Sequence, residues 1–416
     1  MKVPFPIRKK TIVILGAGND QVFLIRTAKR LGLKVIAFDK NPNAPGFSYA
    51  DFPRVISSRD VKKIIPILKD YQQRQGKIHG VATMGSDIPQ IVVKLANFLR
   101  TPSISYKAAL LATNKYDMKK KFTEFNVNTP PYILASELEQ VKSAFHRFNK
   151  VVVIKPLDQA GSRGVSLIKK EDDLKIAFES AKKFSNYPTV LVEKFLSGPQ
   201  ISTESILFNG EIYTPGYADR NYEDLEIFLP QIMENGGTVP SVLTCKKAIV
   251  EEQIQKAADS IGIKNGVIKG DVVLSDNVPY VVEIAARLSG GDFSESLVPL
   301  GSGVNYVETV IKYSIGDVIA PSDFKQRFNN AVANRYFFAA CGKLKEVGGV
   351  EAVKNKHWVK KLDIWYSPGD VLPQINSHGA RTGVFVVVAD DKETLKNRIS
   401  WVYKTITFEI ESIDEL

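Results

Sequence analysis

The segment from Gly270 to Gly291 constrains the fold of this chain more than any other stretch. Two short runs rich in β-forming residues, Val272 to Leu274 and Tyr280 to Ile284, flank the turn-forming sequence Ser275-Asp276-Asn277. This pattern predicts a β-hairpin. The hairpin is followed by a tail that contains an arginine, Arg287, and two successive glycines.

Two acidic residues stand near the open end of the predicted hairpin. If the turn centres on Asn277, Asp271 and Glu283 lie directly opposite each other on one face. Like charges at such positions destabilise a sheet, so we interpret the pair as ligands of a hard divalent cation, which prefers oxygen atoms. The alternative is a pair of solvated acids at strand ends. Arg287 lies close behind Glu283 and is suited to bind an anion.

The composition is that of an ordinary soluble globular protein. The chain has 416 residues, of which 44% are hydrophobic and 24% charged, enough for two to four packed units. Its formal net charge is +11 and its pI about 9.3, but the basic residues are spread along the chain and runs such as Lys119 to Lys121 are short. Because no nucleic-acid-binding motif accompanies the charge, we expect a solvated basic surface and no nucleic-acid partner.

Cysteine, histidine and hydropathy patterns narrow the class further. Cys245 and Cys341 form no Cys-x-x-Cys pattern, which argues against zinc and disulfides and favours a reducing compartment. No apolar run reaches the roughly 20 residues of a membrane span, so we expect a cytoplasmic protein without membrane contact. The histidines show no ligand spacing, and each is interpreted as structural or surface; they are His79, His146, His357 and His378.

The chain begins with a βαβ pattern. Thr11 to Leu15 and Lys34 to Phe38 read as strands around a helix from Gln21 to Leu31, which predicts a parallel sheet. Gly16-Ala17-Gly18 and the later Asp39 resemble part of a dinucleotide fingerprint, but Gln21 replaces its third glycine. A tight strand-to-helix turn is the preferred interpretation.

A glycine-containing loop follows the strand Val151 to Lys155. It runs from Lys155 to Gly164 and precedes a second apolar strand, Val165 to Ile168. Glycines let backbone amides approach an anion, and a strand-end lysine adds a point charge. The loop is therefore a candidate phosphate site, although it is not a Walker P-loop; taken alone, it is also typical of a flexible turn.

These segments together resemble the ATP-grasp superfamily, and as a combination they are specific. The order and approximate spacing match for Lys115, for Lys155 with its loop, for Glu193-Lys194-Phe195-Leu196, for Asp271, and for Glu283-Ile284-Ala285-Ala286-Arg287. The resemblance implies an α/β fold in four parts: an N-terminal Rossmann-like parallel α/β domain (1–112), a small α+β lid (113–190), a central antiparallel-sheet domain with the Mg/ATP site (191–330), and a C-terminal α/β segment on the core (331–416).

The resemblance also implies roles for individual residues. Lys115 and Lys155 would contact ATP phosphates, with the loop closing over them. Asp271 and Glu283 would bind Mg²⁺, with Mn²⁺ as an alternative, and Arg287 would hold the substrate carboxylate or acyl phosphate as the catalytic cation. The remaining ATP-site candidates are Gly161, Ser162, Gly164, Glu193, Lys194, Leu196, Gln200 and Glu204, and the substrate-site candidates are Asp87, Arg220, Asn221, Ser289, Gly290 and Gly291, extending to Ser294.

Three positions depart from the family pattern. Gln200 stands where many relatives carry a ribose-binding acid, and Glu204 is the alternative. Ala285 stands where several branches have an asparagine metal ligand, so magnesium would depend on Asp271, Glu283, phosphates and water. Asn114 replaces a common aspartate before the first lysine, with little expected effect.

The sequence Glu-Ile-Ala-Ala-Arg-Leu-Ser-Gly-Gly resembles the carboxylate-amine ligase branch, which includes amino-acid and dipeptide ligases. The implied activity is ATP-dependent joining of a small carboxylate to an amine through an acyl phosphate. A biotin-carboxylase-like enzyme is the alternative within the fold, and an NAD-dependent oxidoreductase or a non-catalytic nucleotide-binding module are alternatives of other classes. Relatives are often homodimers, but no sequence feature identifies an interface or the substrates.

Overall fold

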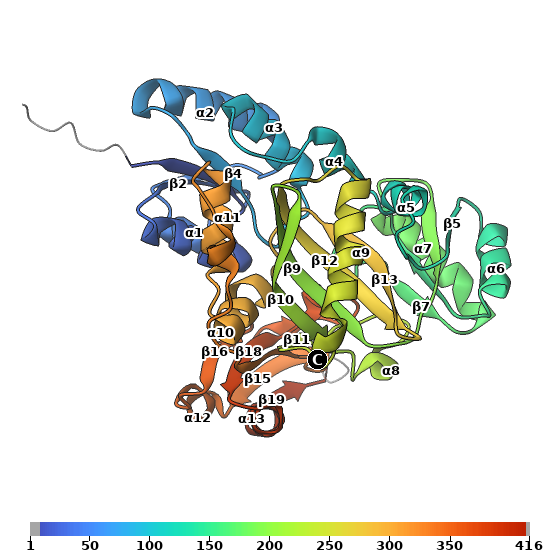
Figure 1. The fold of residues 1–416 in the computed structure, drawn as a ribbon. Helices are drawn as coiled ribbons and strands as arrows, with labels where there is room; N and C mark the ends of the chain where they lie inside the picture. Colours follow the sequence, from blue (N-terminus) through green and yellow to red (C-terminus); the bar gives the residue numbers. More distant parts are fainter. Residues whose placement is uncertain (1–8, 413–416) are drawn as a thin grey trace, which may run out of the picture.

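A four-stranded parallel sheet forms the N-terminal part of the molecule, as the βαβ pattern predicts (Figure 1). The computed structural model describes residues 9–412. β1 and β2 are almost wholly buried, which is typical of parallel strands covered on both faces. The strand order is β3-β2-β1-β4, and the elements are β1 (Thr11–Leu15), α1 (Asn19–Arg30), β2 (Lys34–Asp39), β3 (Phe52–Val55), α2 (Val61–Gln75), β4 (Gly80–Ala82), α3 (Pro89–Leu99) and α4 (Tyr106–Leu111).

A small antiparallel sheet with order β5-β8-β6-β7 forms the predicted α+β lid. Its two helices, α6 and α7, cover one face and share a core with it. The boundary predicted after residue 190 falls within β8, because β8 pairs with both β5 and β6. The elements are β5 (Tyr132–Ala135), α6 (Leu138–Arg147), β6 (Val152–Lys155), β7 (Ser166–Ile168), α7 (Leu174–Phe184) and β8 (Val190–Lys194).

An eight-stranded sheet of order β13-β12-β9-β10-β11-β14-β18-β16 runs through the rest of the molecule. It crosses the boundary predicted after residue 330, since β11 pairs with β14. The C-terminal segment therefore extends the central sheet. The elements of this central part are β9 (Gln200–Phe208), β10 (Glu211–Arg220), α8 (Leu225–Phe228), β11 (Gly237–Val239), α9 (Lys247–Ser260), β12 (Gly266–Ser275), β13 (Val278–Ala285), α10 (Val298–Ser302) and α11 (Tyr306–Ser314).

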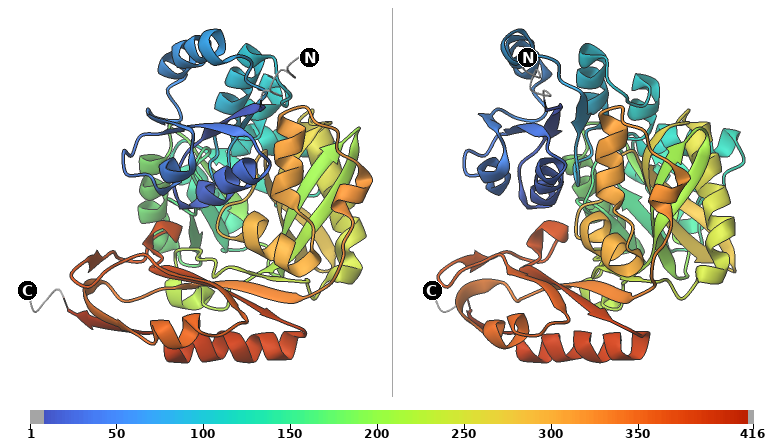
Figure 2. Two further views of the ribbon diagram at one scale, coloured as in Figure 1. Left: turned by 90° about the vertical axis from the view of Figure 1, so that its left-hand side faces the viewer. Right: turned by 60° about the vertical axis from the view of Figure 1, so that its left-hand side comes forward.

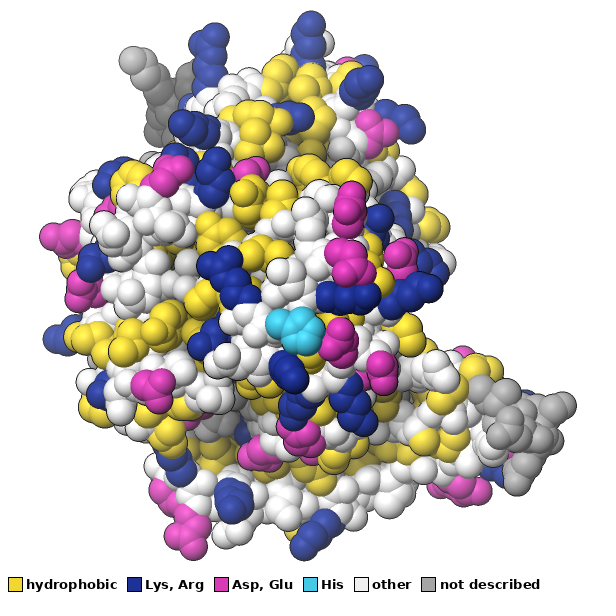
Figure 3. All heavy atoms as spheres, turned by 90° about the vertical axis from the view of Figure 1, so that its right-hand side faces the viewer, with side chains coloured by type: hydrophobic (Ala, Val, Ile, Leu, Met, Phe, Trp, Pro, Cys, Tyr) yellow, Lys and Arg dark blue, Asp and Glu magenta, His cyan; other side chains and the backbone are white. Residues whose placement is uncertain are grey.

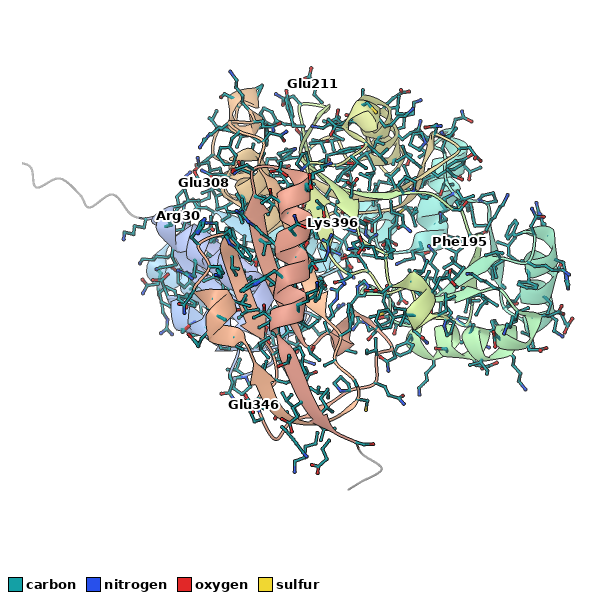
Figure 4. All side chains as sticks on the ribbon, turned by 90° about the horizontal axis from the view of Figure 1, so that it is seen from below. Arg30, Phe195, Glu211, Glu308, Glu346 and Lys396 are labelled. Atoms are coloured by element: carbon teal, nitrogen blue, oxygen red, sulfur yellow. The ribbon has the colours of Figure 1, made fainter. Side chains whose placement is uncertain are left out.

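The C-terminal segment adds a layer below the central part of the molecule, coloured orange to red (Figure 2). The long helix α13 packs on β14 and β18; viewed from below, it crosses the sheet with Lys396 labelled on it (Figure 4). A separate sheet has the order β17-β15-β19. The elements are β14 (Ala331–Phe337), β15 (Gly342–Gly348), α12 (Val350–Lys354), β16 (Val359–Ile364), β17 (Val371–Leu372), β18 (Gly383–Ala389), α13 (Lys392–Thr405) and β19 (Thr407–Glu411).

Two hydrophobic cores hold the parts together. One joins β1 and α1 of the N-terminal domain to α11, where Tyr306 and Ile311 are fully buried. The other lies between α9 and the central sheet and includes Met118 and Phe122 of α5 (Lys115–Glu124). Burial of each such side chain contributes about 1.5–3 kcal/mol. Helix α5, predicted within the lid, thus packs on the central domain and carries Lys115 on a fixed support.

On the side of the molecule that includes the lid, basic side chains are scattered and form no single patch. Lys and Arg side chains lie among Asp and Glu on this face (Figure 3), which agrees with the expected solvated basic surface. Cys245 and Cys341 are both free and exposed. Among the helices of residues 9–412, none combines the length and the apolar character needed to cross a bilayer.

Candidate active site

A cavity of about 830 Å³ lies where the lid, the central sheet, the N-terminal loop around Asp87 and the C-terminal segment meet. Most residues predicted for the site line it, although they come from distant parts of the chain. They are Asp87, Lys115, Lys155, Gly161, Ser162, Glu193, Lys194, Leu196, Gln200, Arg220, Asp271, Glu283, Arg287, Ser289, Gly290 and Gly291. Gly164, Glu204 and Asn221 do not line the cavity, and the roles of all these residues remain predictions.

Asp271 and Glu283 lie directly opposite each other on β12 and β13, as the hairpin analysis predicts. The turn itself differs from the prediction, because it consists of two residues, Asp276 and Asn277, which both have positive φ. A turn of this kind alone would offset the two acids by one residue. A β-bulge at Val282 adds that residue and restores the pairing.

Each carboxylate of this pair contacts basic side chains. Asp271 contacts Lys269 and, at 3.1 Å, the Nη1 atom of Arg220. Glu283 lies 3.3 Å from the Nζ of Lys115. Burial by itself raises the pKa of Glu283, but Lys115 and Lys155 outweigh it, so this pKa lies well below its ordinary value. Glu283 is thus ionised near neutral pH.

The donor set at this hairpin fits a magnesium ion that ATP helps to bind. Magnesium is usually held by one or two carboxylates plus phosphate oxygens and water, and Asp271 and Glu283 supply two carboxylates on one face. Within residues 9–412, no cluster of three or more His, Cys, Asp or Glu side chains has the geometry to hold a metal. Ala285 lies opposite Lys269 and offers no oxygen ligand. A magnesium ion at this hairpin would therefore take its remaining ligands from phosphates and water.

Glu193 lies between two lysines. Its Oε2 is 2.7 Å from the Nζ of Lys155, and its Oε1 is 3.0 Å from the Nζ of Lys119. Lys119 is only 1% exposed, so the interpretation of the run Lys119 to Lys121 as surface charge is wrong for its first member. Burial lowers the pKa of Lys119 to about 8, with Glu193 opposing the shift. The sequence held a signal, since Lys119 follows Lys115 by four residues and both lie on one face of α5.

The glycine loop contacts the N-terminal end of α5. The Nζ of Lys115 donates a hydrogen bond to the backbone oxygen of Gln159 at 2.7 Å. Gly161, Ser162 and Gly164 all have positive φ. A side chain at Gly164 would meet Phe184 of α7 within 2.9 Å, so this glycine is needed for packing under the loop. This explains why Gly164 lies outside the cavity lining.

Arg287 forms a paired contact with Asp87 of the N-terminal domain. Its Nε and Nη2 atoms donate to the two carboxylate oxygens, the second at 3.2 Å. The pKa of Asp87 is lowered, because Arg287 outweighs the effect of burial. A hydrogen bond from the Gly85 amide to the Leu288 carbonyl, at 3.1 Å, fixes the two loops together. Two residues predicted separately thus form one unit.

The loop after Arg287 explains the position of Glu204. Glu204 is 2% exposed; its carboxylate accepts hydrogen bonds from the Ser294 hydroxyl at 2.6 Å and the Ser289 amide at 3.5 Å. This loop covers the acid and separates it from the cavity, so Glu204 does not fit a ribose contact. Gln200 lies on the same strand and lines the cavity.

Two amides of the N-terminal glycine turn donate to side chains. The Ala17 amide donates to Asp39 at 2.8 Å, and the Gly18 amide donates to Gln21 at 2.9 Å. The other oxygen of Asp39 accepts from the Asn41 amide. Asp39 therefore supports the turn itself, which agrees with the structural interpretation of this motif and disfavours the dinucleotide alternative.

Three cavity residues from the C-terminal segment were not identified from the sequence: Tyr336, His378 and Arg381. His378 was interpreted as structural or surface, yet its Nε2 lies 3.3 Å from the Ser162 hydroxyl of the glycine loop and accepts from the Glu234 amide at 3.3 Å. Burial and the nearby Arg381 lower the pKa of His378 to about 3. These residues belong to no motif, and only the tertiary structure brings them to the site.

A small antiparallel lid lies over a sheet that carries the paired acids Asp271 and Glu283, and Lys115 and Lys155 line the same cavity. Residues 112–291 match the family model described as ATP-grasp domain, and residues 335–411 match the model described as L-amino acid ligase C-terminal domain 2. The ATP-grasp match thus covers the part of the chain that contains the lysines, the glycine loop and the acids, and it agrees with the family that these motifs indicate.

Three known proteins resemble this chain over different lengths. A formate-dependent phosphoribosylglycinamide formyltransferase of Prochlorococcus marinus is 29% identical over 199 residues, which cover 46% of this chain and 49% of that protein. The uncharacterized protein y4rH of Sinorhizobium fredii is 22% identical over 99% of this chain and 85% of its own length. The crystal structure of an L-amino acid ligase from Bacillus licheniformis superposes with a TM-score of 0.81 and 19% identity, covering 97% of this chain and 100% of that chain.

Proposed function

We propose that this protein is an ATP- and magnesium-dependent ligase that joins a small-molecule carboxylate to an amine and releases ADP and phosphate. The observation that carries the proposal is the cavity in which Asp271 and Glu283 face Lys115, with Arg287 at the same wall. Such a combination serves phosphoryl transfer, because that chemistry depends mainly on charge neutralisation and alignment. The match of residues 335–411 to an L-amino acid ligase domain supports the same reaction class.

The ion pairs of the site suggest how ATP is accepted. Lys115 contacts Glu283, and Lys155 contacts Glu193. ATP phosphates would take over both lysines, which would free Glu283 for magnesium and one oxygen of Glu193 for the adenine amino group. Lys115, Lys155 and Glu283 would each exchange one charged partner for another of the same sign, and Glu193 would keep Lys119. No ionised group would then be left unpaired in the cavity.

The chemistry needs no nucleophilic side chain. An oxygen of the substrate carboxylate attacks the γ-phosphorus, the bond to the β-phosphate oxygen breaks, and ADP leaves. The amine nitrogen then attacks the acyl carbon, the carbon–oxygen bond to phosphate breaks, and the amine loses a proton. Asp271 and Glu283 would hold magnesium, which would supply charge neutralisation at the phosphates. Arg287, oriented by Asp87, would hold the substrate carboxylate and stabilise developing negative charge.

A bicarbonate-activating carboxylase stays an alternative, since the same lysines, acids and arginine serve it. Structural similarity to biotin carboxylase from Campylobacter jejuni, with a TM-score of 0.72 at 19% identity, concerns the fold alone. A cytoplasmic location and a homodimer also stay proposals.

The test is an ADP-release screen of carboxylates against amines, with mass spectrometry of the products. We expect release to require ATP, magnesium and both substrates, and to be lost in Glu283→Gln and Arg287→Ala. Release that depends only on bicarbonate would favour the carboxylase. Unchanged release in both variants would reject this site, and NAD binding without magnesium-dependent ATP binding would reject the ligase.

A further inference from the structure

A second, smaller cavity lies between the N-terminal domain and the central part of the molecule. Its volume is about 70 Å³, and its walls come from β4, α3, the segment before α4, the start of β12, the tail that follows β13, and α11. Helix α11 and strand β4 lie side by side at this junction (Figure 1). Among residues 9–412, Arg287 alone lines both this cavity and the main one. We call the smaller space the junction cavity.

The elements around the junction cavity are tightly packed, so the space does not result from loose packing. A Cβ atom at Gly80 of β4 would lie only 2.4 Å from the backbone oxygen of Ser314 in α11. A Cβ atom at Gly266, at the start of β12, would lie 2.8 Å from the Cγ2 atom of Ile104. Protein interiors contain few voids larger than a water molecule, and a dry apolar void between rigid walls can bind a small molecule.

The junction cavity offers an apolar lining without a free charge. Arg287 is the one charged lining residue among those described, and its three guanidinium nitrogen atoms already donate to Asp87 and to the Leu288 carbonyl. Burying a charged ligand without a counter-ion is costly, so the cavity fits a neutral molecule. Valines on three elements contribute to the apolar lining: Val92 and Val93 of α3, Val267 of β12 and Val310 of α11.

Hydroxyl groups give the junction cavity a polar side. The Thr83 hydroxyl donates a hydrogen bond to the Leu15 carbonyl at 2.8 Å. The Ser314 hydroxyl donates to the Val310 carbonyl, also at 2.8 Å. Because both protons are directed to the backbone, these oxygen atoms can only accept a further hydrogen bond. The lining therefore favours a ligand that donates one.

The volume of the junction cavity limits the size of its ligand. An apolar cavity of roughly 150 Å³ binds benzene, so the volume of about 70 Å³ has room for a smaller molecule. A neutral alcohol with roughly three carbon atoms matches the volume, the apolar lining and the hydrogen-bond acceptors.

The tail that follows β13 separates the two cavities. Leu288 lines the junction cavity, and the next residue, Ser289, lines the main one. A β-bridge between Met84 and Leu288 holds the tail against the N-terminal domain. Because Arg287 directly precedes Leu288, a molecule that packs on Leu288 would support the backbone of Arg287 in the position in which its side chain meets Asp87.

We propose that the junction cavity is an effector site for a small neutral alcohol, and that its occupant favours the observed pairing of Arg287 with Asp87. Binding follows from the size and lining of the cavity, whereas the effect on catalysis rests on the proposed ligase function. The two states that the effector distinguishes are Arg287 paired with Asp87 and Arg287 released. An effector that prefers the paired state would tighten binding of the carboxylate substrate, and the carboxylate would tighten binding of the effector by the same factor.

Xenon and n-propanol test the site on the full chain without nucleotide. Xenon NMR detects an accessible apolar cavity, and amide chemical shifts follow a titration with n-propanol. We expect Val92→Phe, which fills the cavity from α3, to abolish the xenon signal and to weaken n-propanol at least about 10-fold. Val318→Phe makes the same change at a residue that is 92% exposed and should bind as the wild type does. Val92→Ile adds one methyl group and should cause a smaller loss, which covers the case that Val92→Phe does not fold.

The coupling to Arg287 is tested with and without turnover. Asp87→Asn releases Arg287, so this variant should bind n-propanol about five-fold more weakly than the wild type. During turnover, n-propanol should lower the KM for the carboxylate by about the same factor, and Val92→Phe should no longer respond to it.

Each outcome decides one part of the inference. The site is overturned if the wild type binds neither xenon nor n-propanol, if Val92→Phe and Val318→Phe bind equally well, or if hexanol binds as tightly as n-propanol. The effector role is overturned if Asp87→Asn binds n-propanol normally or if the KM of an active enzyme does not change. If binding and its loss in Asp87→Asn are as expected but no carboxylate stimulates ADP release, the ligase proposal fails and the effector site stands.

Discussion

The Nζ of Lys119 lies 3.0 Å from Oε1 of Glu193, and both side chains are at least 97% buried. Lys155 contacts the other oxygen of Glu193 and is also the lysine assigned to the phosphates. Lys119 donates a second hydrogen bond to the Thr129 hydroxyl at 2.7 Å, so its position is fixed from two sides. Lys119 can therefore stay in contact with Glu193 when Lys155 moves to ATP.

Replacement of Lys119 by methionine should therefore weaken nucleotide recognition. Without Lys119, the buried Glu193 loses the ion pair at its Oε1 atom, so its carboxylate is less well positioned to accept from an adenine amino group. We expect ATP binding to weaken about 10-fold, the size of one charge-assisted hydrogen bond, and the preference for ATP over GTP to fall. Competition with a fluorescent ATP analogue measures both; the exposed neighbour Lys120→Met is the control, and equal binding by the two variants would refute the role.

Glu283→Gln should reduce the affinity for the divalent ion. A neutral amide is a weaker ligand than a carboxylate for a hard cation, and it also leaves Lys115 without its 3.3 Å partner. We expect Mn²⁺ binding, measured by electron paramagnetic resonance with ATP present, to weaken about 10-fold or more, because a charged contact contributes about 1.5–3 kcal/mol. Glu211→Gln, at the start of β10, should bind Mn²⁺ normally. Unchanged Mn²⁺ affinity in Glu283→Gln would place the metal elsewhere.

Asp87→Asn should impair the use of the carboxylate substrate. Asp87 lies in the N-terminal domain, and its negative charge orients Arg287. The variant removes this charge, so Arg287 can adopt other positions. We expect kcat/KM for the carboxylate to fall about 10- to 100-fold, while the KM for ATP changes less than about two-fold. Steady-state kinetics with each substrate varied in turn resolves the two effects. The exposed control Asp70→Asn should behave as the wild type, and a selective rise in the KM for ATP would contradict the assignment.

Glu295 should give the protein a distinctive pH dependence of stability. Burial, with Asp292 close by, raises the pKa of Glu295 to about 8, although Lys361 opposes the shift. Between pH 5 and 8 the folded protein therefore keeps a proton that the unfolded chain releases, so the free energy of unfolding falls as the pH rises, by at most about 1.4 kcal/mol per pH unit. Urea denaturation at several pH values should show that Glu295→Gln removes this contribution relative to the wild type, whereas the exposed control Glu346→Gln follows the wild-type curve. Parallel curves for all three would rule out the effect.

The hairpin shows why part of the site was readable from the sequence and part was not. Alternation along β12 and β13 fixes which side chains share a face, so the pairing of Asp271 with Glu283 follows from residue types and turn chemistry. The bulge at Val282 has no such local signal, and it offsets the difference between the predicted turn centre at Asn277 and the observed two-residue turn. Strand pairing is a property of two strands together, so irregularities within it depend on the packed sheet.

Glu204 and Gln200 also show that strand periodicity alone does not determine which residue reaches a site. Both residues lie on the face of β9 that points toward the site, and the sequence alone left open which of them reaches the nucleotide. The loop of Ser289 to Ser294 covers Glu204, which no periodicity on β9 could indicate.

The sequence by itself determined the fold class, the order of the lysines and acids, and the glycine loop, because these depend on local periodicity and turn chemistry. The sequence also determined the carboxylate pair of the hairpin. Only the tertiary structure decided which charge meets which: Arg287 and Asp87 are 200 residues apart, and His378 and Ser162 are 216 apart. The physical reason is that ion pairs and burial depend on distance in space, which packing of separate elements sets, whereas a sequence pattern reports only neighbours along the chain.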